Sequence, residues 1–223
     1  MIATATTPDA ELFSLRLRTA TRAQHQEAED SRFMAALIDG ELPTAGYSAL
    51  AGQLWHVYVA LEDGATQLAE HPVVGPFLAR ELNRRSALEA DLAYLIGPHW
   101  QAESPATEAT ARYADRIRQV ALTWPEGFIA HHYTRYLGDL SGGQILLRQL
   151  QRAYDFPAEA LSFFVFSGIP KPKVFKDRYR DLLDTIALDT AGQDRIIAEA
   201  RLAFELNTAL FTTLGSRFLP DAR

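Results

Sequence analysis

Apolar residues recur along most of the chain at the three- and four-residue spacing of amphipathic helices, and the alternation typical of strands is scarce. Thr7-Pro8-Asp9 is a helix-start signal, and prolines and glycines separate the later segments. The predicted helices cover residues 9–30, 31–38, 44–70, 84–95, 105–123, 125–154, 173–187 and 192–214. No internal repeat or linker interrupts them, so we expect an all-α fold in a single domain, 1–223, with a flexible N-terminus at 1–8.

Composition narrows the possible chemistry. Of the 223 residues, 48% are hydrophobic, and the formal net charge of −6 argues against a nucleic-acid-binding protein. The chain has no cysteine, which leaves histidine, carboxylate or tyrosine to hold any metal. The N-terminus lacks the basic and apolar regions of a signal peptide, and no apolar run approaches the ~18 residues of a membrane span. We therefore expect a cytoplasmic protein without a membrane span.

Segment 9–30 carries an unusual polar face. Because successive helical residues advance by about 100°, one side of this helix presents Arg18, Arg22, His25 and Glu29. Leu or Val normally occupies such a seam. One interpretation is a solvated face with an i,i+4 pair between His25 and Glu29, and this helix alone favours it. The alternative is a metal-binding His25 oriented by Glu29, with the arginines holding an anion nearby.

Three glycines, Gly138, Gly142 and Gly143, lie within the run 131–144 of segment 125–154, where each costs roughly 0.8–1.0 kcal/mol relative to alanine in a helix. Gly138 and Gly142 have the spacing that lets another helix approach closely. Alternatively, a flat ligand lies against bare backbone, where any Cβ would collide with it, and the glycines let the helix bend. The residues alone leave both explanations open. In the second, Asp139 would anchor ordered water and manage protons.

The run YTRYLGDLSGGQ at 133–144 resembles the distal-helix signature of the haem oxygenase family. The run LRTATRAQHQEAE at 17–29 resembles the proximal helix of the same family. Shorter matches follow in family order at 58–62, 88–92, 175–180 and 203–207. The resemblance covers most of the chain and implies an all-helical fold that sandwiches haem between the first helix and a glycine-bent distal helix.

The resemblance also implies site residues. It implies that His25 is the proximal iron ligand, that Glu29 orients it, and that Asp139 organises distal water. The residues implied to act with Asp139 are Tyr58, Arg135, Gly138, Gly142 and Asn207. Those implied to contact haem elsewhere are Arg18, Arg22, Tyr133, Lys176 and Arg180 around the propionates, and Thr134, Gly143, Phe204 and Phe211 along the ring. Family members often carry lysine at the positions of Arg18 and Arg22, and arginine changes the hydrogen-bond geometry there.

The implied reaction uses O2 and external electrons to cleave haem, both substrate and cofactor, at the α-meso carbon to biliverdin, CO and Fe2+. No nucleotide-binding glycine fingerprint follows a strand, so we expect a separate donor: a ferredoxin, a flavodoxin or an NAD(P)H-dependent reductase. A non-catalytic haem transport or sensor protein is the alternative, although it would not need Asp139 or the glycine wall. A ferritin-like di-iron protein would need paired Glu-x-x-His motifs, which the sequence lacks. His131 and His132 adjoin the signature and are expected at the surface, not as ligands.

Overall fold

The computed structural model describes residues 11–219, and within that range every regular element is helical. The all-α fold expected from the sequence is therefore confirmed. The α-helices are α1 (Phe13–Ala20), α2 (Arg22–Glu29), α3 (Arg32–Ile38), α4 (Thr44–Gln67), α5 (Arg85–Leu95), α6 (Trp100–Glu103), α7 (Glu108–Thr123), α8 (Pro125–His132), α9 (Gly138–Tyr154), α10 (Pro172–Asp184) and α11 (Thr190–Phe218). Short 3-10 helices are η1 (Gly75–Phe77), η2 (Arg80–Leu82), η4 (Ala158–Ala160) and η5 (Ser162–Phe164). A π-helical segment, η3 (Tyr133–Leu137), joins α8 to α9.

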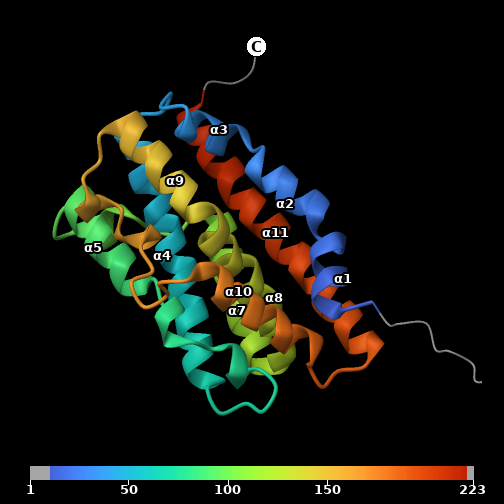
Figure 1. Ribbon diagram of the computed structural model, residues 1–223. Coiled ribbons are helices and arrows are strands. Elements are labelled where there is room, and N and C mark those ends of the chain that lie inside the picture. The colour runs from blue at the N-terminus through green and yellow to red at the C-terminus, as the bar shows by residue number, and fades with distance from the viewer. Residues whose placement is uncertain (1–10, 220–223) are drawn as a thin grey trace, which may run out of the picture.

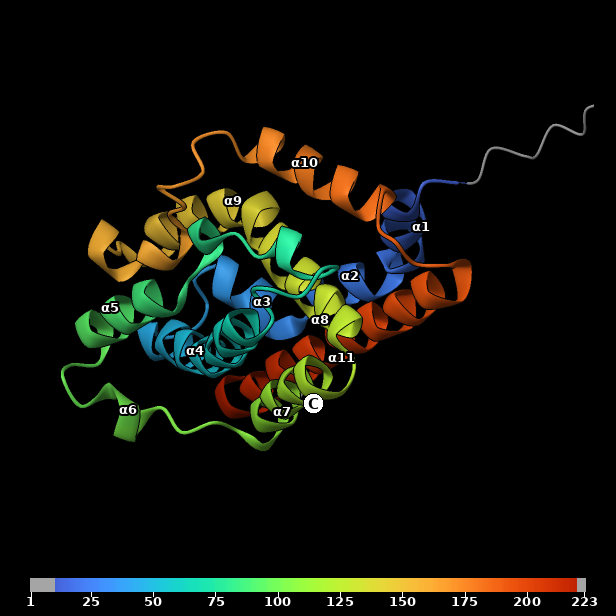
Figure 2. The ribbon, with the colours of Figure 1, turned by 90° about the horizontal axis from the view of Figure 1, so that it is seen from below.

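The long helices pack around one hydrophobic core. The N-terminal helices α1 and α2 lie along α11, which also packs on α7 and α8 (Figure 1). Helix α4 packs on α5 and α7, and α10 lies outside α9 with its end near α1 (Figure 2). Apolar side chains from these helices form a single contiguous buried cluster that includes Val57, Leu61, Ile117 and Ile196. This framework holds α2 and α9 on opposite sides of the space described below.

The predicted helix 9–30 is two helices. Thr21 separates α1 from α2, and its hydroxyl donates to the carbonyl oxygen of Leu17 at 2.8 Å. Such bonding back along the chain competes with regular helix geometry and bends helices. Arg18 therefore belongs to α1, whereas His25 belongs to α2. The Thr7-Pro8-Asp9 signal and the flexible N-terminus at 1–8 lie outside the described residues.

The predicted segment 125–154 is divided into α8, η3 and α9, and the remaining predicted helices are present with shifted ends. Pro125 begins α8, as its fixed φ and missing N–H favour at a first helical position. Asp189 caps α11, because its carboxylate accepts a hydrogen bond from the Gly192 N–H at 2.8 Å. Helix α6 and the 3-10 helices were not predicted, since a single turn leaves too few residues to show a period.

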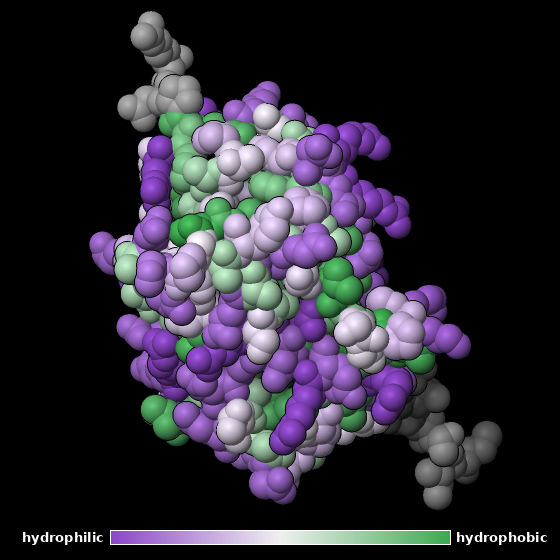
Figure 3. All heavy atoms as spheres, turned by 90° about the vertical axis from the view of Figure 1, so that its left-hand side faces the viewer, coloured by the Kyte–Doolittle hydropathy of each residue, from purple (hydrophilic) through white to green (hydrophobic). Residues whose placement is uncertain are grey.

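The surface carries no large apolar face in the view of Figure 3, where hydrophilic residues predominate and apolar ones are scattered. The large apolar side chains that are most exposed, Leu122 and Ile145, lie on different helices. Among the helices of residues 11–219, none combines the length and the apolar character needed to cross a membrane.

Candidate active site

A cavity of about 380 Å³ lies between α2, the η3–α9 helix and α11. His25 and Glu29 line it from α2, and Phe204, Asn207 and Phe211 line it from α11. The opposite wall is a stripe of η3–α9 made of Thr134, Arg135, Gly138, Asp139, Gly142 and Gly143. The two unusual faces recognised in the sequence therefore meet across one space.

His25 is held at the cavity by two neighbours. Its Nδ1 lies 3.3 Å from Oε2 of Glu29, one helical turn later. The edge of its ring meets the Phe204 ring, with the centroids 5.6 Å apart. The side chain is 48% exposed, so it is open to the space that it borders. Because Glu29 pairs with Nδ1, Nε2 is the ring nitrogen left to bind a metal.

The distal glycines face open space. A Cβ added to Gly138 or Gly142 would meet no atom within 4 Å. At Gly143 it would lie 3.5 Å from the Phe164 ring, an ordinary contact. In contrast, a Cβ at Gly64 of α4 would come within 2.6 Å of Phe128. Helix–helix approach therefore explains Gly64 but not Gly138 or Gly142, whose bare backbone is open to the cavity.

The π-helical segment sets the direction of this wall. Residues 133–137 wind more widely than an α-helix, between α8 and α9. The residues that line the cavity follow at 134, 135, 138, 139, 142 and 143, a stripe that continues through the π segment into α9. Such π segments occur often at functional sites. The sequence predicted a bent helix but contained no signal for a π segment.

A buried hydrogen-bond network surrounds Asp139. The Tyr58 hydroxyl donates to Oδ2 of Asp139, and Arg135 Nη2 donates to Oδ1 at 3.2 Å. Arg135 also donates from Nε to the Tyr58 hydroxyl at 3.3 Å and from Nη1 to Oδ1 of Asn207 at 2.8 Å. Burial raises the pKa of Asp139, and the Arg135 charge partly offsets that rise. Tyr58, Arg135 and Asn207, which the resemblance implied to organise water with Asp139, thus form one connected hydrogen-bond network with it.

A cationic edge lies where α1, η3 and α10 meet. Burial raises the pKa of Tyr133, and the charges of Arg180 and Arg18 oppose that rise, so both cations lie near the phenol. Lys176 Nζ donates to Ser141 of α9 at 2.9 Å, and Arg180 Nη1 donates to Asp177 at 2.7 Å. Four of the predicted propionate-binding residues thus gather beside the distal helix and do not line the cavity. The fifth, Arg22, is exposed and has no contact with these four among the described residues.

The expectation that His131 and His132 lie at the surface is wrong. Both are buried in α8, with relative exposures of 0% and 2%. His131 Nε2 lies 2.9 Å from Oε1 of Glu199, which also accepts from Arg116 Nε at 2.8 Å. His132 Nδ1 lies 3.0 Å from the Tyr179 hydroxyl. These partners make burial tolerable for imidazole, and neither histidine lines the cavity.

Part of the cavity wall was missed. An apolar side is formed by Met34, Ile38, Leu50, Leu54, Phe163 and Phe164, from α3, α4 and η5. Their pattern in the sequence is that of ordinary core residues, and no site role was expected for any of the six. No signal in a single sequence separates an apolar side chain that faces a cavity from one that faces the core.

Known proteins are similar to this chain in both fold and sequence. The family model described as "Heme oxygenase" matches residues 11–213. Haem oxygenase 1 of Bos taurus is 41% identical, over 97% of this chain and 77% of its own length. Haem oxygenase 1 of Synechocystis is 39% identical, over 92% of this chain and 85% of its own. A crystal structure of the Synechocystis enzyme in complex with haem superposes with a TM-score of 0.88, at 38% identity, covering 92% of this chain and 93% of that one. The chain therefore belongs to the haem oxygenase family.

Proposed function

We propose that this enzyme uses O2 and externally supplied electrons to cleave haem at the α-meso carbon, which yields biliverdin, CO and Fe2+. One observation carries the proposal: His25 faces the bare backbone of Gly138 and Gly142 across a cavity that also contains the Asp139 network. Family membership supports the same reaction class.

The residues present fit haem. Its flat macrocycle suits a space where backbone without Cβ atoms forms one wall and Phe204 and Phe211 contribute to another. The buried Thr134 hydroxyl oxygen in this wall has no partner among the described residues and is available to the ligand side. Two propionates match the cations Arg18, Lys176 and Arg180 near Tyr133, with Arg22 one turn beyond Arg18.

On the proximal side, His25 Nε2 would bind the iron while Glu29 fixes the ring through Nδ1. Bound haem supplies the iron that activates O2 and the ring that is opened. Histidine holds haem iron in globins and peroxidases alike, so the outcome of the reaction would depend on the distal side.

On the distal side, Asp139 is the group that holds or passes a proton. Burial raises the pKa of its carboxyl, which makes proton uptake easier than for an exposed aspartate. Tyr58 and Arg135 fix its two oxygens, and Asn207 fixes Arg135 in turn. Asp139 would thereby order water beside the glycine wall, and this water would carry protons into the cavity.

The proposal includes three further points. Electrons come from a separate donor of the ferredoxin, flavodoxin or NAD(P)H-dependent reductase kind. We also place the reaction in the cytoplasm, because a chain without cysteine is compatible with a reducing compartment. The contiguous core of the described residues supports a single domain over 1–223.

The test is optical. Purified protein is titrated with hemin, and a reductant or reductase is then added under air with catalase present. A one-to-one complex that loses its Soret band and releases extractable biliverdin of the α isomer is expected. A stable haem complex that does not react with any competent donor would favour a transport or sensor protein instead.

A further inference from the structure

Two aromatic walls of the cavity belong to a segment with little regular structure of its own. Phe163 and Phe164 lie in the single-turn helix η5 between α9 and α10, and both line the cavity. Their relative exposures are 2% and 3%. A single 3-10 turn cannot hold such positions by its own hydrogen bonds. Its position must come from contacts with other elements.

Asp91 of α5 binds the start of this segment. Its Oδ1 accepts from the Ser162 N–H and its Oδ2 from the Phe163 N–H, both at 2.8 Å. Asp91 is fully buried, with a relative exposure of 0%. A buried carboxylate is costly unless it is hydrogen-bonded, and bonds to an ionised acceptor are stronger than neutral ones. The two backbone groups therefore have one defined position relative to α5.

Arg84, just before α5, binds the other end. Its Nη1 donates to the carbonyl oxygens of Phe163 at 3.3 Å and Val165 at 2.7 Å. Its guanidinium lies 3.9 Å from the centre of the Phe166 ring. Asp91 thus holds the N–H groups of the segment and Arg84 holds its carbonyl groups. We name these two residues the α5 clamp.

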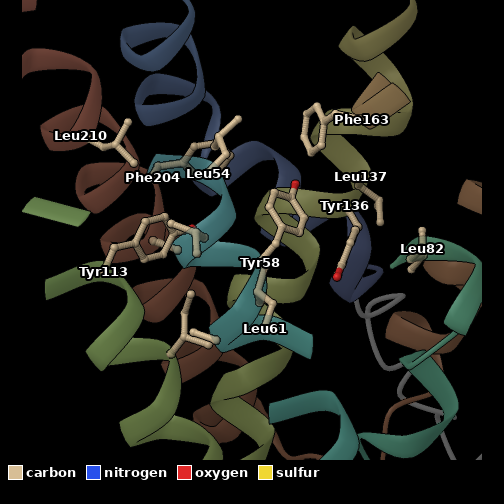
Figure 4. Close-up of a cluster of buried hydrophobic side chains, with 14 of the residues drawn as sticks. Leu54, Tyr58, Leu61, Leu82, Tyr113, Tyr136, Leu137, Phe163, Phe204 and Leu210 are labelled. Atoms are coloured by element: carbon tan, nitrogen blue, oxygen red, sulfur yellow. The ribbon is translucent and has the colours of Figure 1, made fainter. Parts of the chain in front are cut away.

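The clamped segment contacts the distal network. The Phe163 ring meets the Tyr58 ring edge-on, with the centroids 5.4 Å apart (Figure 4). The Tyr136 ring also contacts the Tyr58 ring, with the centroids 5.5 Å apart. Gln144 of α9 donates from Nε2 to the Phe164 carbonyl oxygen at 3.0 Å. Tyr58 is itself the donor to Asp139. A shift of the segment would therefore move an aromatic neighbour of the hydroxyl that fixes Asp139.

We propose that Asp91 and Arg84 are positioning residues of the distal pocket, which fix residues 162–166 so that Phe163 keeps Tyr58 against Asp139. The inference rests on the proposed function. Neither clamp residue lines the cavity, so neither contacts haem. The α5 clamp therefore acts on Asp139 indirectly, because it fixes Phe163, Phe163 packs on Tyr58, and Tyr58 donates to Asp139.

The test compares full-length Asp91→Asn with the wild type. An asparagine would present an amide to one of the two N–H donors and lose that bond. We expect hydrogen exchange of the Ser162 and Phe163 amides in the haem-free protein to rise about tenfold or more. In the haem complex we expect biliverdin formation to slow about tenfold, since small misplacements in a site are costly to rate, while haem affinity stays within about threefold.

Two further variants separate positioning from stability. Phe163→Leu keeps the clamp and removes the ring on Tyr58, so it should slow biliverdin formation without exposing the two amides. Thr107→Ala removes the side-chain cap of α7, away from the cavity, and should lower the melting temperature with normal biliverdin formation. Normal rates in both Asp91→Asn and Phe163→Leu, or unchanged amide exchange in Asp91→Asn, would overturn the inference alone. A wild type that binds haem without releasing biliverdin would overturn the proposed function and this inference with it.

Discussion

At the residue scale, the proposed iron site depends on a pair of side chains one turn apart. His25 lies in a helix of eight residues, and Glu29 is the last of them. The 3.3 Å separation from Nδ1 orients the ring, although both side chains are about half exposed or more. Exposed pairs contribute little to stability, so this one is better explained by orientation of the ring than by folding.

His25→Ala is expected to leave the fold intact and to abolish biliverdin formation, because no other histidine among residues 11–219 lines the cavity. Glu29→Gln is expected to lower the rate about tenfold, as loss of a ligand's outer partner usually does. Hemin titration and the optical assay measure both. A His25→Ala protein with the wild-type spectrum and rate would contradict the ligand assignment.

Asp139→Ala removes the one carboxylate that the described part of the chain contributes to the cavity's distal wall. The variant should still bind haem through His25, yet consume it without releasing biliverdin, because protons are no longer delivered in the right place. Extraction and chromatography of the products measure this outcome. Asp115→Ala, at an exposed site on α7, is the control. A normal biliverdin yield from Asp139→Ala would rule out its role.

At the element scale, the glycines of the η3–α9 helix lower its stability but leave its backbone open to the cavity. Gly142→Leu should raise the stability of the haem-free protein by about 0.5–1 kcal/mol, since leucine is the better helix former and its Cβ would meet no atom within 4 Å. The same side chain should lower haem affinity about tenfold or more by occupying the cavity. Thermal unfolding and hemin titration measure the two effects.

Gly64→Ala is the matched control for that prediction. Its Cβ would lie 2.6 Å from Phe128, which is fully buried, so stability should fall by about 1–3 kcal/mol. Opposite signs at the two glycines would separate a ligand wall from a helix contact. A loss of stability in Gly142→Leu would show that Gly142 is a packing residue.

Sequence periodicity predicted these elements well but not their interruptions. The long amphipathic segments and the proline-marked start of α8 are local features that a single sequence contains. The break at Thr21 and the π segment depend on how neighbouring helices pack, so no period marks them. Of the site, the polar and glycine faces were recognisable because they violate helix rules. Phe163 and Leu54 were not, because an apolar side chain looks the same beside a cavity or a core.

At the scale of the whole molecule, the burial of two histidines is the feature that the sequence did not indicate. His131 contacts Tyr113 of α7 and Glu199 of α11, and His132 contacts Tyr179 of α10. The local sequence around residues 131–132 does not predict that these side chains are buried, because their burial depends on helices that are distant in the sequence. The single-domain organisation likewise stays a prediction, supported by the contiguous core.

That burial gives the haem-free protein an expected sensitivity to acid. Burial lowers the pKa of His132 to about 3, from an ordinary value of 6.5. Between these values the unfolded chain binds a proton that the folded chain does not, so stability falls as the pH drops through this window. From about pH 7.5 to about pH 5 the loss from this one group is about 2 kcal/mol. Burial also lowers the pKa of His131, which adds a loss of the same sign.

Urea unfolding at several pH values tests this with His132→Gln. The glutamine keeps a polar atom for the Tyr179 hydroxyl but cannot take up a proton, so the variant should be less stable at neutral pH and decline less steeply toward pH 5. His99→Gln, which changes an exposed histidine, should keep the wild-type slope. If His132→Gln and the wild type lost equal stability over this range, His132 would have to be protonated in the folded protein. Its burial against Tyr179 and Phe128 opposes such a charge, because the ring lies among apolar and neutral groups with no carboxylate recorded in contact with it among the described residues.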